Sequence, residues 1–188
     1  MHNNIMPLEE NQKNNPVNEQ KASRLKVLAI HPHDLMCSDS VLRKRSQEVT
    51  EIKSPQTASL CNTLCDIFYS IPYAKGLSAI QLGIPLQIAL VNLSRKPGQE
   101  TFFINPFDIK LSGRLVKRSE GCLCLPNYKA SISRRNKITL NAFSPEGRKF
   151  AYSAIGYEAA VIQHELDHMS GRFYWDYLSD GAKPDPVS

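Results

Sequence analysis

The segment VIQHELDHMSG, residues 161–171, carries two histidines four positions apart, His164 and His168, and Glu165 directly follows the first. On a helix, residues i and i+4 lie on one face, so both imidazoles can bind one ion. Glu165 lies beside the first ligand, where its carboxylate can reach a metal-bound water without binding the metal. Two neutral imidazoles, one general base and an open metal position are the chemical content of the H-E-x-x-H pattern.

The residues before this pair indicate that its helix is buried. The stretch AAVI, residues 159–162, is entirely apolar and leads directly into the motif. Two solvated histidines on a surface helix are the alternative interpretation. Buried imidazoles and a buried carboxylate need polar partners, however, and a metal ion is such a partner. The segment therefore favours a metal site.

Two histidines leave a catalytic metal one protein ligand short. In the longer protease pattern H-E-x-x-H-x-x-G-x-x-H, Gly171 matches the glycine, but Tyr174 stands where the third histidine is required. Thermolysin-like proteases take a glutamate from a following helix, and this chain has no glutamate after His168. The third ligand must therefore come from upstream or be a different type of residue.

A candidate source is EGCLCLP, residues 120–126, which contains Cys122 and Cys124. If this short apolar stretch is a strand, positions i and i+2 share a face, and either thiol could approach the ion. A thiolate is a soft, charged ligand suited to iron(II) or zinc. Two buried cysteines without a metal are the alternative, and this segment alone does not decide between them.

The elements that must position these residues give a mixed pattern. Ser54 as N-cap and Pro55 at the first position predict a helix over residues 54–71. Strands are predicted at PLQIALVN, TFFINP, NKITLNAF and RKFAYSA, with turn residues between the last two. A second helix, starting near Gly156, carries the histidines. Short strands followed by a late helix predict an α+β domain.

Bulk properties narrow the class of protein. A chain of 188 residues is long enough for one well-filled core. We divide it into a flexible polar leader at 1–24, a single catalytic domain at 25–180 and a short tail at 181–188. The net charge of +5 permits transient contact with an anionic partner such as ribosomal RNA. The basic residues are scattered, which does not indicate specific nucleic-acid binding.

The chain shows no export or membrane signal. It has no apolar run near eighteen residues, and the leader has no apolar signal core. Five cysteines are an odd number, which argues against a disulfide framework. Reduced thiols fit a cytoplasmic protein. We also expect no contact with membranes.

Three blocks together resemble the peptide deformylase family. AKGLSAIQLG at 74–83 corresponds to the family's G-x-G-L-A-A-x-Q, EGCLCLP to its E-G-C-L-S, and QHELDHMSG at 163–171 to its Q-H-E-x-D-H-x-x-G. DSVLRKRSQEV at 39–49 is similar to an early D-x-x-L-R segment. The resemblance spans residues 27–178. It implies an α+β fold with antiparallel sheets around a central helix that bears the histidines.

The resemblance also implies an activity and a metal. The expected reaction is hydrolysis of the formyl group from N-formyl-methionyl nascent peptides, which releases formate. Cys122, His164 and His168 would hold one divalent metal together with a water, and Glu165 would be the general base. Iron(II) would be the native metal, and zinc, nickel or cobalt could substitute.

The remaining roles also follow from the resemblance. Gln81 and the backbone N–H of Leu123 would stabilise the oxyanion. Gly76 would let the substrate backbone pass close. Glu120 would pair with Arg134 and brace the loop that carries the metal ligand.

The chain departs from the family pattern at Ala74, Ser78, Ile80 and Cys124. We expect these departures to affect substrate specificity more than the hydrolysis itself. Many bacterial relatives carry a long basic C-terminal helix that docks on the ribosome. The last residues, DYLSDGAKPDPVS, do not predict such a helix, so the sequence does not determine whether the transient ribosome contact that the net charge permits takes place. A zinc endopeptidase of the HExxH type and a non-catalytic or retargeted relative are the alternative functions.

Overall fold

The computed structural model describes residues 25–32, 34–35 and 40–187. The predicted leader at 1–24 lies outside the described residues. The elements, in chain order, are η1 (Val41–Arg43), α2 (Pro55–Ser70), β1 (Gly76–Ser78), η2 (Ala79–Leu82), β2 (Ile88–Val91), β3 (Thr101–Cys122), β4 (Leu125–Phe143), β5 (Lys149–Ile155), α3 (Tyr157–Met169), η3 (Tyr174–Tyr177) and β6 (Asp185–Pro186).

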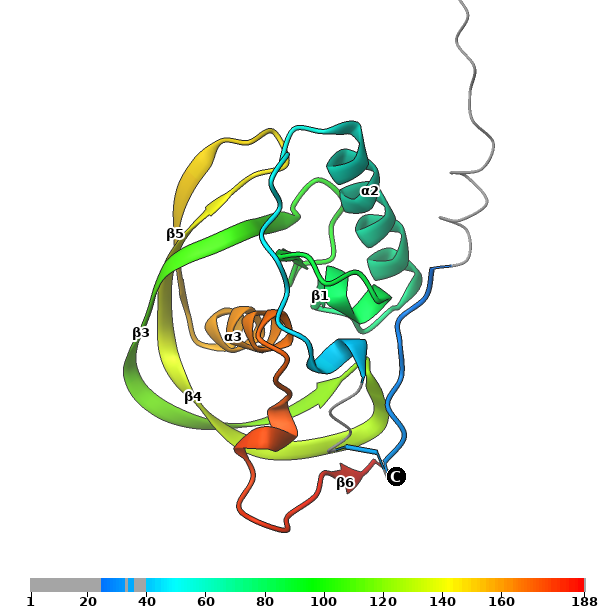
Figure 1. Ribbon diagram of the computed structural model, residues 1–188. Coiled ribbons are helices and arrows are strands. Elements are labelled where there is room, and N and C mark those ends of the chain that lie inside the picture. Colours follow the sequence, from blue (N-terminus) through cyan, green and yellow to red (C-terminus); the bar gives the residue numbers. More distant parts are fainter. Residues whose placement is uncertain (1–24, 33, 36–39, 188) are drawn as a thin grey trace, which may run out of the picture.

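The strands form one antiparallel sheet that curves around α3. The order is β1-β2-β3-β4-β5, and β6 pairs with β4. Figure 1 shows the long strands β3 and β4 arching around α3, which lies near the centre of the molecule. Helix α2 lies on the side of α3 that faces away from this arch. Helix α3 contacts β4, β5, β1 and β2. The predicted α+β class, with an antiparallel sheet around a central helix, is confirmed.

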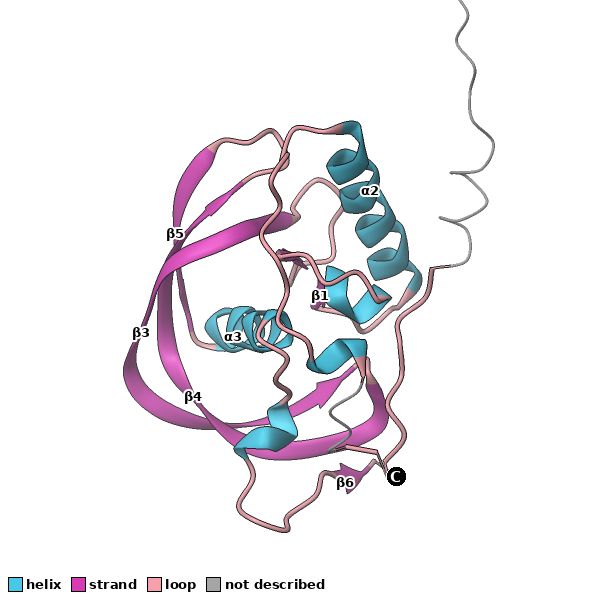
Figure 2. Ribbon diagram, in the orientation of Figure 1, coloured by secondary structure: helices cyan, strands magenta, loops and turns pink. Residues whose placement is uncertain are grey.

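Helix α2 forms where its capping residues predict it. The Ser54 hydroxyl accepts a hydrogen bond from the Thr57 N–H at 3.2 Å, and Pro55 occupies the first helical position. Cys61, Leu64 and Phe68 recur at helical spacing and are buried on one face. These residues pack in a hydrophobic cluster with β1, β2 and η2. Figure 2, coloured by secondary structure, shows α2 on the side of the molecule away from the arching strands β3 and β4.

Strand β3 is much longer than the predicted strand TFFINP at its start. It continues through a stretch at 108–115 in which every residue is exposed. Register shifts interrupt its pairing with β4, and Asn105 and Asp108 have positive φ. Alternation between apolar and polar residues arises where one face of a strand is buried. Residues 107–112, FDIKLS, nevertheless alternate between apolar and polar types, although Ile109 and Leu111 are exposed. This alternation was an available strand signal that the prediction did not use.

The interpretation of EGCLCLP as a single strand is wrong. Strand β3 ends at Cys122, β4 begins at Leu125, and the pairing of these two residues closes a two-residue turn. Leu123 and Cys124 form that turn. A turn reverses the chain within four residues, so the rule that i and i+2 share a strand face does not apply here.

The proposed division into a domain at 25–180 and a tail at 181–188 stays a prediction. Within the tail, Asp185 and Pro186 pair with Lys129 and Tyr128 of β4. Among the described residues, no helix is both long enough and apolar enough to span a membrane.

Replacement of the N-cap should weaken α2. Ser54→Ala removes the acceptor for the Thr57 N–H, so the free energy of unfolding should fall by about 1 kcal/mol. The measurement is urea unfolding followed by circular dichroism. Ser59→Ala is the matched control, because Ser59 is an exposed residue inside the same helix. Equal losses in the two variants would contradict the capping role.

Candidate metal centre

Helix α3 presents both histidines because its opposite face is anchored in the core. Ala159 and Ile162 are buried in a hydrophobic cluster with β2, β4 and β5. The helix ends at Met169, and Gly171 then turns the chain with φ of +72°. A Cβ at this glycine would lie 2.2 Å from the carbonyl oxygen of Arg43, so only glycine fits.

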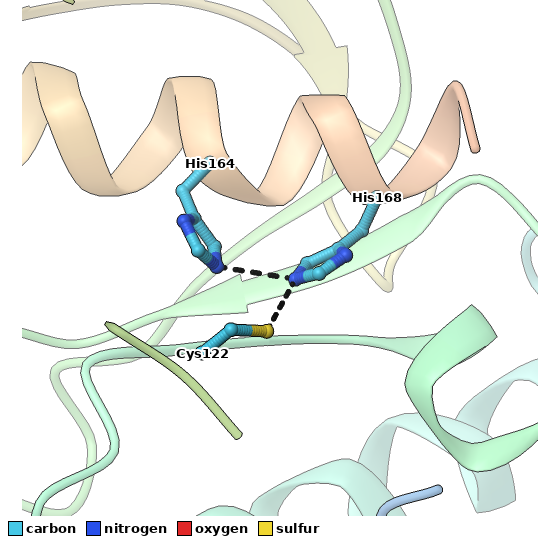
Figure 3. A group of neighbouring side chains, drawn as sticks. All are labelled: Cys122, His164 and His168. Atoms are coloured by element: carbon cyan, nitrogen blue, oxygen red, sulfur yellow. Dashed lines mark hydrogen bonds between the residues drawn. The ribbon is translucent and has the colours of Figure 1, made fainter. Parts of the chain in front are cut away.

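Three side chains from two separate segments meet in front of α3. Figure 3 shows Cys122 facing His164 and His168. The two Nε2 atoms lie 3.1 Å apart, and Cys122 Sγ lies 3.3 Å from His168 Nε2. One ligand atom from each of the three residues lies within 4.8 Å of the others. Of the two candidate thiols, the turn therefore brings Cys122 to the histidines.

The donor set fits a divalent metal. His164 Nδ1 lies 3.0 Å from Glu120 Oε2, and a carboxylate accepts from an N–H. This contact favours the tautomer in which His164 Nε2 keeps a free lone pair directed at the other two donors. Two imidazole nitrogens and one sulfur are the ligand types that zinc and iron(II) prefer.

Glu120 is itself held by Arg134. The guanidinium donates to both carboxylate oxygens, from Nε to Oε1 at 2.8 Å and from Nη2 to Oε2 at 2.9 Å. Arg134 is only 4% exposed and also contacts the carboxylate of Asp167 on α3. Burial pushes the pKa of Glu120 up, but hydrogen bonds from Arg134 and His164 outweigh it and hold the pKa at about 2. Glu120 is therefore an anion in the folded protein.

The remaining buried groups disfavour their charged forms. Burial raises the pKa of the Cys122 thiol, and the neighbouring Cys124 raises it further. Burial, and then repulsion from His164, lower the pKa of His168. Burial also raises the pKa of Glu165. A divalent cation among these groups would favour the thiolate and the neutral imidazole, which are the forms that bind metal.

Glu165 lies next to the ligands but faces β1. Its Oε2 accepts a hydrogen bond from the Ser78 hydroxyl at 2.5 Å. Gly76 packs directly against the same carboxylate, since a Cβ at this position would lie 2.4 Å from Glu165 Oε1. The close approach of Glu165 is therefore a reason for glycine here, in addition to the predicted passage of substrate.

Gln81 in η2 reaches the turn that holds the cysteines. Its Oε1 accepts from the Ser78 N–H at 2.8 Å, so its Nε2 points the other way. This Nε2 lies 3.5 Å from Cys124 Sγ and 3.9 Å from Cys122 Sγ. Leu123 lies next to Cys122 in the turn and is half-buried. The structure thus brings together all the side chains that the sequence selected.

Two contributors were not selected from the sequence. Asp167 accepts from the Tyr177 hydroxyl at 2.8 Å and contacts Arg134, which ties α3 to β4 and η3. The sequence did offer one signal for Asp167, because it is a charged residue within a helical motif that is predicted to be buried. Ser78 was noticed as a departure from the family pattern, but its contact with Glu165 joins residues 87 positions apart and has no local signal.

Known proteins are similar to this chain along most of its length. The family model for polypeptide deformylase matches residues 35–183. Peptide deformylase 2 of Vibrio cholerae is 35% identical over 145 residues, which cover 77% of this chain and 84% of that protein. The peptide deformylase of Agrobacterium fabrum is 30% identical over 147 residues, covering 77% and 85%.

Solved structures of the same kind are also similar. A peptide deformylase from Legionella pneumophila superimposes with a TM-score of 0.74 at 28% identity, covering 83% of this chain and 86% of that chain. A plant peptide deformylase gives a TM-score of 0.73 at 29% identity, covering 84% and 82%. The arrangement of the elements is therefore shared along most of the chain.

Loss of Arg134 should strongly destabilise the fold. Arg134→Met removes the buried cation that bridges Glu120 and Asp167 and leaves Asp167 with the exposed Arg172, and loss of one partner of a buried ion pair typically costs about 3–5 kcal/mol. Urea unfolding measures this loss. Arg135→Met is the matched control, because Arg135 is exposed and, among the described residues, its guanidinium donates to the Gly113 carbonyl alone. A loss of stability no larger than that of the control would contradict the network.

Proposed function

The chain belongs to the peptide deformylase family, and from this premise we propose how its own residues carry out the reaction. It is a metal-dependent hydrolase that removes the formyl group from N-formyl-methionyl peptides. The proposal concerns the ligands, the base, the oxyanion donors and the partners. The observation that carries it is the meeting of Cys122 Sγ with the two Nε2 atoms of His164 and His168, beside the buried Glu165.

We assign Cys122, His164 and His168 as the metal ligands, with Glu120 orienting His164. The native metal is iron(II), and zinc, nickel or cobalt can replace it. When bound, such a metal supplies the Lewis acidity that makes water a nucleophile near neutral pH. Of these ligands, the Cys122 thiolate would contribute one negative charge and the two imidazoles would bind in their neutral form.

Glu165 is the general base and then the general acid. Its carboxylate takes the proton from the attacking water as a bond forms between that oxygen and the formyl carbon. It then returns the proton to the nitrogen as the carbon–nitrogen bond breaks. The products are formate and a peptide with a free N-terminus. The raised pKa of Glu165, caused by its burial, suits a group that must both accept and donate a proton near neutral pH.

Gln81 and the Leu123 N–H stabilise the negative charge that develops on the formyl oxygen. The Ser78 N–H holds Gln81 Oε1, so the donating amide nitrogen faces the ligand turn. A donor that is already oriented needs no reorganisation when the charge develops, and one such donor is worth about 2.7–4 kcal/mol. Gly76 lets the substrate backbone approach Glu165 without a side chain between them.

The proposed setting is the cytoplasm, where the substrates are nascent peptides. Contact with the ribosome is transient in this proposal, and we assign no specific nucleic-acid target and no membrane contact. The endopeptidase alternative has little support from the described site. Tyr174 occupies the position of a third histidine, and its ring stacks on His164 with centroids 6.2 Å apart.

Replacement of the base should separate metal binding from turnover. Glu165→Gln keeps the metal, because Glu165 is not a ligand, but should lose at least a hundredfold in kcat. The measurements are formate release from formyl-Met-Ala-Ser and metal analysis on anaerobically purified protein. Cleavage of an internal peptide by the parent protein, without formate release from this substrate, would favour the endopeptidase. Loss of metal in parallel with activity would make Glu165 a ligand.

The two thiols should differ in their effect on the metal. Cys122→Ser replaces a thiolate by a neutral hydroxyl and should lower metal content and iron-dependent activity together. Cys124→Ser is the matched control in the same turn, and it should retain the metal because Cys124 lies outside the ligand group. Metal loss in Cys124→Ser with retention in Cys122→Ser would reverse the ligand assignment.

A further inference from the structure

Ser78 makes a contact that the family pattern does not include. It is the last residue of β1, and it is fully buried. Its hydroxyl lies 2.5 Å from Glu165 Oε2 and 3.2 Å from the Glu165 carbonyl oxygen. A hydroxyl has one hydrogen to donate, and a separation of 2.5 Å is typical of a hydrogen bond from O–H to a carboxylate. The hydroxyl of Ser78 therefore donates its hydrogen to Glu165 Oε2.

The same residue also holds Gln81. The Ser78 N–H donates to Gln81 Oε1 at 2.8 Å, and this contact is available to any residue at the position except proline. The hydroxyl contact with Glu165 requires a serine or a close equivalent. Ser78 therefore joins the proposed oxyanion donor and the proposed base through two different groups, and only one of these groups depends on the side chain.

The two oxygens of Glu165 have different surroundings. Oε2 accepts the hydrogen bond from the Ser78 hydroxyl, whereas Oε1 packs against the backbone of Gly76. In the part of the chain that the structure describes, no other side chain donates a hydrogen bond to this carboxylate. Rotation of the carboxyl group would exchange the two oxygens, and the Ser78 hydroxyl opposes that rotation.

We propose that Ser78 is a positioning residue that binds Oε2 of Glu165 and thereby reserves Oε1 for proton transfer. The inference rests on the function proposed above, in which Glu165 moves the proton. Ser78 itself does not touch the reacting atoms. It acts on turnover by limiting the orientations of the base, because proton transfer requires the accepting oxygen to stay within hydrogen-bonding reach of the water.

A purely structural role for the hydroxyl predicts a different result. A buried serine whose bonds only satisfy its own polarity would affect stability and leave turnover unchanged. Ser46 provides a control for the loss of a buried hydroxyl outside the proposed site. It is 3% exposed, and its hydroxyl has no hydrogen-bond partner in the described structure. It is not part of the proposed site.

The kinetic test compares Ser78→Ala with Ser46→Ala. Ser78→Ala should retain the metal, keep KM for formyl-Met-Ala-Ser within about twofold and lose about tenfold in kcat, a part of the contribution of a positioned base. Ser46→Ala should match the parent in kcat. An unchanged kcat in Ser78→Ala, or a loss explained by reduced metal content, would overturn the proposal. A parent protein that releases no formate would instead contradict the proposed function.

A second measurement tests the contact without using activity. Ser78→Ala, Glu165→Met and the double variant are unfolded with urea, since methionine is similar in size to glutamate and lacks its oxygens. If the hydroxyl acts through Glu165, the shifts in unfolding midpoint are coupled, and the double variant departs from the sum of the single shifts. Additive shifts would show that the two side chains do not interact and would overturn the proposal.

Discussion

The buried guanidinium of Arg134 lies between two buried carboxylates, and the geometry of the site depends on this arrangement. Glu120 comes from β3, Arg134 from β4 and Asp167 from α3, so one cation connects the sheet to the central helix. The second oxygen of Glu120 then orients His164. Removal of Arg134 would take away the one cation that bridges both carboxylates, and loss of a partner from a buried ion pair is costly. The network therefore constrains the position of the histidines more strongly than α3 alone would.

The same burial makes the site suitable for a metal. Cys122 and His168 are buried, and the directions of their pKa shifts favour the neutral thiol and the neutral imidazole. Repulsion from His164 adds to the effect of burial and keeps His168 neutral. A divalent cation would give the Cys122 thiolate a partner of opposite charge. Metal binding, ligand protonation and folding are thus linked in this protein.

The four departures from the family pattern fall into two groups. Ala74 and Ile80 are buried in hydrophobic clusters, where changes among apolar residues alter packing. Ser78 and Cys124 place polar or polarisable atoms next to two side chains of the proposed site, since Ser78 binds Glu165 and Cys124 Sγ lies 3.5 Å from Gln81 Nε2. The altered chemistry is therefore concentrated at the proposed base and at the proposed oxyanion donor.

Local interactions explain what the sequence by itself determined. The i, i+4 spacing of His164 and His168 and the capping of α2 by Ser54 depend on residues a few positions apart, so they could be recognised in the sequence. The three motif blocks also identified the family. The choice between Cys122 and Cys124 was different: their spacing allowed either, and the interpretation of their segment as one strand was wrong.

Only the tertiary structure decided the contacts that join distant segments. The separation along the chain is 46 residues for Cys122 and His168, and 87 residues for Ser78 and Glu165. Which side chains meet across such distances depends on the register of β3 with β4 and on how α3 packs inside the curved sheet. Neither can be read from a local pattern, because register shifts interrupt the pairing of β3 with β4 and because Cys122 lies at the end of β3, directly before the turn.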